Sequence, residues 1–123
     1  MFVIMCDDKE ITTTENVGTN KVEYVLKPNV PERYKPWGLF KNSNRESAFS
    51  VIRWFEDRAF PEERVGCKEL LEELGLDRYD PWEIVKKTRG TLMTDYFWLK
   101  VEPADTYEEF SLRGAAGFPP VQF

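Results

Sequence analysis

Carboxylates are the most abundant side chains here that could do acid–base chemistry, since the 123 residues include 22 acidic residues and no histidine. The absence of histidine excludes Ser-His-Asp and Cys-His nucleophile systems and HExxH metal sites. Two carboxylates alone can catalyse hydrolysis, as in glycosidases. The candidate pairs are Glu56/Asp57, Glu62/Glu63, Glu69 and Glu72/Glu73. Nearly all fall on predicted helix exteriors, where a raised pKa is hard to arrange, so we expect no catalytic residue and no enzyme.

Other reactive groups do not form a recognisable metal or cofactor site. Asp7, Asp8 and Glu10 are the nearest approach to an oxygen cluster, but the spacing of a calcium-binding EF-hand is absent. Cys6 and Cys67 are the only thiols, fewer than a structural zinc site needs. We expect both cysteines to be small buried hydrophobes in a reducing compartment. The sequence therefore predicts no metal and no cofactor.

Charge is distributed unevenly along the chain. The net charge of −5 argues against an overall cationic nucleic-acid binder, so we do not expect direct nucleic-acid binding. Residues 32–53 carry five basic and two acidic side chains, whereas residues 56–83 carry ten acidic and four basic ones. The default interpretation is two solvated helix faces. The alternative is an acidic surface that docks on a basic protein groove, with five glutamates as its partner-binding residues: Glu62, Glu63, Glu69, Glu72 and Glu73.

A proline corner interrupts this acidic stretch. Arg58 and Arg64 bracket Pro61, next to several carboxylates. Arginine forms planar, bidentate contacts with carboxylates and also binds carbonyl oxygens at helix ends. We therefore interpret Arg58, Pro61 and Arg64 as a structural corner that locks two helices together.

The elements that would position these residues indicate an α+β fold. Strands are predicted at residues 2–6, 10–14 and 21–26, and a later strand at 92–101 is apolar on both faces. Helical spacing and caps predict short helices near residues 49–59, 67–74 and 81–89. We predict one domain over 1–123, with a small antiparallel N-terminal sheet packed on two or three short helices and a later strand rejoining it.

Aromatic residues and the chain ends complete the prediction. Trp54, Trp82 and Trp98 fall on apolar faces and are expected in the core, and Trp37, Leu39 and Phe40 are expected to pin a proline-rich segment across it. The tail from about residue 106 is predicted to be irregular and mobile.

No apolar run is long enough for a membrane helix, and the first residues do not resemble a signal peptide. We expect a cytoplasmic protein without membrane contact; its oligomeric state is not indicated.

Part of the chain resembles a known family segment. The pattern runs Ala48, Trp54, Arg58-Ala59-x-Pro61-x-x-Arg64-x-Gly66, then Glu69-Leu70-Leu71-Glu72-x-Leu74-Gly75, then Gly90-x-x-x-x-Asp95-x-x-Trp98-Leu99-Lys100. Over residues 47–101 it resembles the accessory segment N-terminal to the kinase domain in Firmicutes HipA-like kinase proteins and related mobile-element or phage proteins. The chain has no kinase core, so no catalytic or nucleotide-binding residue is implied.

These observations favour a non-catalytic protein-binding module of phage or mobile-element type. One possible partner is a HipA-like kinase or toxin, which the module would regulate in the manner of a toxin–antitoxin system. The alternative is an anti-CRISPR-like inhibitor, whose acidic surface would block the nucleic-acid groove of a host defence nuclease. That alternative rests on analogy between protein classes.

Overall fold

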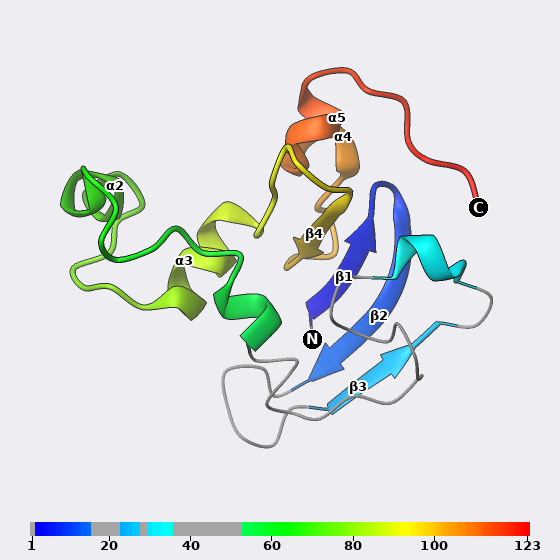
Figure 1. The fold of residues 1–123 in the computed structure, drawn as a ribbon, viewed down its shortest axis with the longest axis horizontal. Helices are drawn as coiled ribbons and strands as arrows, with labels where there is room; N and C mark the ends of the chain where they lie inside the picture. Colours follow the sequence, from blue (N-terminus) through cyan, green and yellow to red (C-terminus); the bar gives the residue numbers. More distant parts are fainter. Residues whose placement is uncertain (1, 16–22, 28–29, 36–52) are drawn as a thin grey trace.

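A four-stranded antiparallel sheet forms the body of the protein (Figure 1). The computed structural model describes residues 2–15, 23–27, 30–35 and 53–123. The strand order is β3-β2-β1-β4, and the bounds are β1 Phe2–Cys6, β2 Lys9–Glu15, β3 Glu23–Leu26 and β4 Phe97–Lys100. Strand β4 pairs with β1, from Val3 opposite Lys100 to Cys6 opposite Phe97. The predicted α+β architecture, with a later strand rejoining an N-terminal sheet, is confirmed.

Both faces of the sheet are covered by apolar packing. One face carries Ile4, Cys6, Ile11 and Leu99, which pack with Phe55 and Val85 from the helical regions. The other face carries a second cluster of buried residues: Val3, Met5, Trp98 and Tyr107. Adjacent residues of β1 and β4 point to opposite faces, so neither strand shows a polar face. This explains the doubly apolar pattern around β4, although the strand lies at an edge of the sheet.

Short helices surround this sheet, and residues 53–56 are also helical. Their bounds are η1 Glu32–Tyr34, α2 Cys67–Glu73, α3 Pro81–Thr88, α4 Tyr107–Phe110 and α5 Leu112–Ala115. Helix α3 begins as its sequence predicts, because the Asp80 side chain accepts hydrogen bonds from the amides of Trp82 and Glu83. Its Ile84 and Val85 are fully buried. Within the described part of the chain, no helix has the length and apolar character needed to cross a bilayer.

Two predictions about the C-terminal half are wrong in part. The predicted strand over residues 92–101 is formed only from Phe97 to Lys100. The tail from about residue 106 is not irregular throughout, since it contains α4 and α5. These helices form because the Thr106 and Ser111 side chains accept hydrogen bonds from backbone amides at the two N-termini. Tyr107 at the start of α4 is buried.

The tryptophans are placed unevenly. Trp98 is fully buried, and its Nε1 donates to the carbonyl oxygen of Asp7 at 2.7 Å. Trp54 and Trp82 are half-buried and pack against the first core cluster. The predicted role of Trp37, Leu39 and Phe40 falls outside the described residues.

Candidate protein-binding site

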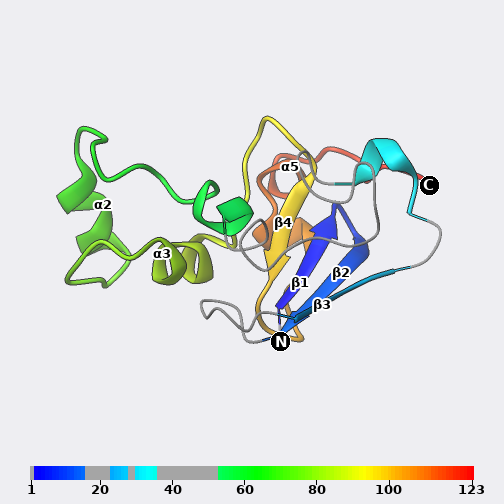
Figure 2. The same ribbon diagram turned by 60° about the horizontal axis from the view of Figure 1, so that its bottom comes forward.

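Residues 61–78, here called the arm, extend away from the sheet. Helix α2 lies within the arm and far from the strands in both views (Figures 1 and 2). At its base, the Tyr79 hydroxyl donates to the carbonyl oxygen of Phe60 at 2.6 Å, and the two rings meet edge to face. These contacts join the start and the end of the arm, so it leaves the body as a closed loop.

Local backbone geometry shapes the arm around α2. Gly66 precedes the helix with φ 81°, and Gly75 follows it with φ 76°. Both values lie in the left-handed region that glycine adopts without penalty. After the helix, the amide of Leu76 donates to the carbonyl oxygen of Leu71 at 2.8 Å, which closes the C-terminal turn. The two glycines therefore limit α2 to a short helix held within a turn-rich arm.

The glutamates predicted to bind a partner all lie on this arm and are exposed: Glu62, Glu63, Glu69, Glu72 and Glu73. Residues 61–78 carry six acidic and three basic side chains, so the arm is net negative. The negative charge of the arm also acts on Tyr79 at the base of the arm. Burial raises the pKa of the Tyr79 hydroxyl, and the nearby Cys67, Glu62 and Glu63 raise this pKa further. A carboxylate that acts as a general acid needs a buried setting, and these five do not have one.

The apolar residues of α2 are less exposed than the glutamates of the arm. Cys67, Leu70, Leu71 and Leu74 share one side of α2 and are half-buried, while the helix has no fully buried residue. The prediction that Cys67 is buried is therefore wrong, because α2 does not pack into the core. Val65, immediately before α2, is 98% exposed. The arm thus presents one bare aliphatic side chain among carboxylates.

The proline corner is anchored at one of its two arginines. Nη1 and Nη2 of Arg58 donate to the two carboxylate oxygens of Asp95 at 3.0 and 2.9 Å. Nε donates to the carbonyl oxygen of Gly90 at 2.5 Å, and Nη2 also donates to that of Phe97 at 2.7 Å. The guanidinium lies over the Trp54 ring. Arg58 therefore joins the segment before the arm to the α3–β4 connection and to β4.

Arg64 does not share this role. Pro61 and Arg64 are both exposed, and Arg64 uses only its backbone: its amide donates to the carbonyl oxygen of Pro61, and its carbonyl oxygen accepts from the amide of Cys67. Among the described residues, the Arg64 side chain forms no hydrogen bond and no ion pair. The predicted corner of two arginines is wrong for Arg64, because the arm carries it away from the carboxylates of the body.

The acidic cluster near the N-terminus has a structural role that the sequence analysis missed. Asp7 is fully buried, and its carboxylate accepts hydrogen bonds from Arg113 Nε at 3.1 Å and from the amide of Val121 at 3.0 Å. Asp8 pairs with Lys9. In the described part of the chain, no group of three or more His, Cys, Asp or Glu side chains could hold a metal ion. The sequence did not predict the Asp7–Arg113 contact, because the two residues are 106 positions apart.

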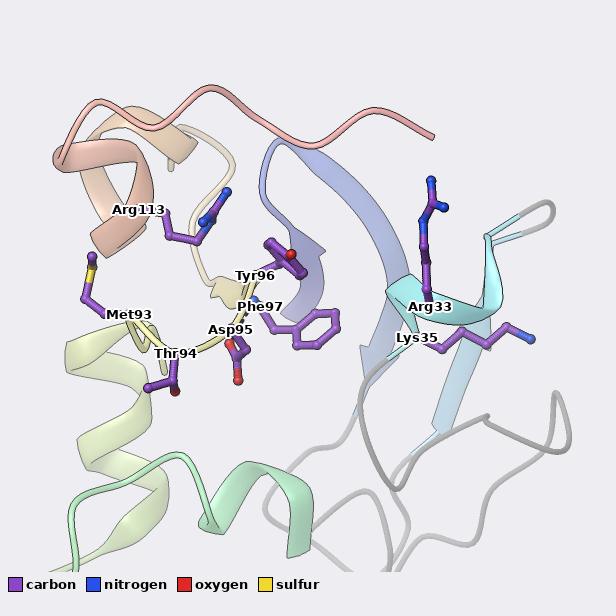
Figure 3. Close-up of a pocket in the computed structure, with 8 residues that line it drawn as sticks. All are labelled: Arg33, Lys35, Met93, Thr94, Asp95, Tyr96, Phe97 and Arg113. Atoms are coloured by element: carbon purple, nitrogen blue, oxygen red, sulfur yellow. Dashed lines mark hydrogen bonds between the residues drawn. The ribbon is translucent and has the colours of Figure 1, made fainter.

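A hollow of about 320 Å³ lies between the loop before β4 and η1 (Figure 3). Its lining residues are Arg33, Lys35, Met93, Thr94, Asp95, Tyr96, Phe97 and Arg113. Arg113 lies over the Tyr96 ring and Arg33 over the Tyr34 ring. Among the described residues, Asp95 of the lining pairs with Arg58, and Arg113 of the lining pairs with Asp7. This hollow lies outside the predicted acidic surface.

Comparisons with protein-family models, with curated proteins and with solved structures found no match for this chain. The resemblance of residues 47–101 to the HipA-associated segment stays a prediction.

Proposed function

We propose that this protein is a non-catalytic protein-binding module that docks on a basic surface of its partner through the arm. The observation that carries the proposal is the exposure of all five glutamates on a segment that extends away from the sheet. Surface carboxylates concentrated on one protrusion steer association with a basic partner and raise the association rate. Arg58 supports this role indirectly, since it fixes the segment from which the arm leaves the body.

The partner we propose is a bacterial protein such as a HipA-like kinase or toxin, regulated by this chain as a separately encoded module of phage or mobile-element type. The support is the resemblance of residues 47–101, a range that contains the whole arm.

The test is a comparison of two baits in extracts of the source cell. One bait is the wild-type chain, and the other carries Glu62→Lys, Glu63→Lys, Glu72→Lys and Glu73→Lys. Each substituted residue is exposed, and exposed charges change stability by less than about 1 kcal/mol each, so the variant should still fold, which a melting curve checks. A HipA-like kinase retained only by the wild-type bait, with association slowed by salt, is the expected result. Equal retention by both baits, or an association rate insensitive to salt, would refute docking through the arm.

A second candidate is favoured by the same charge pattern. Six acidic side chains on one protrusion could occupy a nuclease groove that normally binds phosphates. This would make the chain an anti-CRISPR-like inhibitor. Recovery of a defence nuclease in place of a kinase, together with loss of its DNA binding when the wild-type chain is added, would favour this function. A kinase reading frame beside the gene would favour the first.

A further inference from the structure

Residues 117–123, here called the strap, lie across one end of the body. The strap follows α5, and in both views its last residues lie beside η1 (Figures 1 and 2). In the close-up it crosses from the Arg113 side of the hollow to the Arg33 side (Figure 3). The strap therefore spans this hollow, whose walls include the loop before β4 and η1.

One anchor of the strap is the Asp7 carboxylate. Its Oδ2 accepts a hydrogen bond from the amide of Val121 at 3.0 Å, and Arg113 Nε binds the same carboxylate. Nearer α5, the Tyr107 hydroxyl donates to the carbonyl oxygen of Phe118 at 2.9 Å, and the Arg113 guanidinium lies over the Phe118 ring. Polar groups of the body thus hold the strap at two positions.

The other anchor is an aromatic stack on η1. The Phe123 ring stacks on Tyr34, with the ring centroids 5.1 Å apart, and Lys9 Nζ lies 5.7 Å from the Phe123 centroid. The Tyr34 ring also meets Tyr96 of the opposite wall edge to face, at 5.8 Å, and packs against the first core cluster. Tyr34 therefore contacts both the strap and the opposite wall of the hollow.

The strap buries little surface. None of its residues is fully buried, and Phe118 and Phe123 are each 47% exposed. Its first residue, Gly117, has φ 87°, in the left-handed region that glycine adopts without penalty. Segments with few buried contacts open before the core of a protein does. The strap can therefore detach at Gly117 while the sheet stays folded.

We infer that the strap is a clamp that opens as one unit and sets how closely η1 approaches the loop before β4. When closed, it holds Tyr34 against Tyr96 through the Phe123 stack. When open, it removes one ring contact of Tyr34, so η1 can move away from the loop and widen the hollow. Opening leaves no buried charge alone, because Arg113 stays paired with Asp7. This device is independent of the arm and goes beyond the proposed function.

The experiment follows amide hydrogen exchange by NMR in the full chain, with one reporter in each part. The amide of Val121 reports the strap, the amide of Tyr34 reports η1, and the amide of Leu99 reports β4. These amides donate hydrogen bonds at 3.0, 2.9 and 2.7 Å, respectively, so each exchanges when its bond opens. A cross-peak between the Tyr34 and Tyr96 rings reports the separation of the two walls.

Two variants weaken the strap at different positions. Phe123→Ala removes the stack on η1, and Val121→Pro removes the amide that binds Asp7 without changing any charge. Their matched control is Gln122→Ala. Gln122 lies between them, is exposed, and its side chain hydrogen-bonds within the strap.

We expect both variants to speed exchange of the Tyr34 amide about two- to tenfold, the range expected from one aromatic pair or one hydrogen bond. Both should weaken the Tyr34–Tyr96 cross-peak, and Phe123→Ala should speed exchange of the Val121 amide by the same factor. The Leu99 amide and the control should stay as in wild type. The effect of Val121→Pro on Tyr34 is decisive, because the Val121 amide binds Asp7 and not η1, so only a strap that opens as one unit transmits it.

Three results would overturn the inference. They are a Tyr34 amide unchanged in either variant, an equally large increase at Leu99, and a Tyr34–Tyr96 cross-peak unchanged in both variants. None of these measurements involves the arm or its partner, so they leave the test of the proposed function unaffected.

Discussion

Replacing Arg58 with lysine tests the anchor of the arm. The Arg58 side chain is 5% exposed and donates four hydrogen bonds, to Asp95, Gly90 and Phe97. Lysine keeps the charge but has a single ammonium group, which cannot reproduce the planar fork of arginine. It can stay close to Asp95 and then leaves two backbone carbonyl oxygens without their donor.

The size of the effect follows from those two carbonyls. A buried polar group left without its partner costs about 1–3 kcal/mol, so for the two carbonyls we expect Arg58→Lys to lower the free energy of unfolding by roughly 2–6 kcal/mol. In a chain of this size, each kcal/mol shifts the melting temperature by roughly 4 °C. The variant should therefore melt roughly 8–24 °C below wild type, measured by circular dichroism and checked by urea unfolding.

Arg64→Lys is the matched control. Arg64 is exposed and its side chain forms no hydrogen bond with described residues, so its replacement should change stability by no more than about 0.5 kcal/mol. Equal effects of the two substitutions, or an Arg58→Lys variant that unfolds like wild type, would show that the fork of Arg58 does not hold the α3–β4 connection in place.

Four further substitutions probe other parts of the chain. Trp98→Ala should cost about 3–5 kcal/mol in urea unfolding because it empties a fully buried site; a loss below about 1 kcal/mol would contradict the described packing. Burial opposes ionisation of Asp105, but hydrogen bonds from Arg89 and two amides outweigh it and lower its pKa. This carboxylate therefore adds stability above its ordinary pKa of 3.8, and the stability is lost as the pH falls through the lowered value. Asp105→Asn should be destabilised at pH 7, with a difference from wild type that shrinks in acid; a difference independent of pH would refute this. Gly90→Ala and Gly75→Ala should each lose about 1–2 kcal/mol from their left-handed backbone, because a Cβ at Gly90 would meet its neighbours only at ordinary contact distances of 3.4 Å or more and one at Gly75 would meet none.

Local signals predicted the elements that depend on neighbouring residues. Asp80 before Pro81 is sufficient to start α3, because the cap uses amides two and three residues away. The apolar pattern around Trp98 likewise predicted a buried strand, since alternation reports burial on each face. The five glutamates of the arm are exposed as predicted, while their role in binding stays a prediction.

Contacts between distant residues could not be predicted in this way. The sequence relates Asp7 only to an incomplete oxygen cluster with Asp8 and Glu10, because no local pattern connects it to Arg113, 106 positions away. Arg58 was correctly expected to bind a carboxylate and carbonyls, but the partner is Asp95, not a residue of the corner. The late start of β4 has the same cause: Asp95 accepts from the amide of Phe97 and from Arg58, which holds residues before Phe97 in a loop.

The Asp7 contact also has a consequence for synthesis on the ribosome. Translation makes β1 and β2 first, yet the Asp7 carboxylate between them is paired by Arg113 and by the amide of Val121. A buried carboxylate without a counter-charge is strongly unfavourable, so the nascent β1–β2 hairpin cannot reach its final burial before residues 113–121 leave the exit tunnel. Trp98, which donates to the carbonyl oxygen of Asp7, adds the same dependence for β4. The β1–β2 hairpin is made before these residues but can complete its burial only after residues 113–121 have left the ribosome.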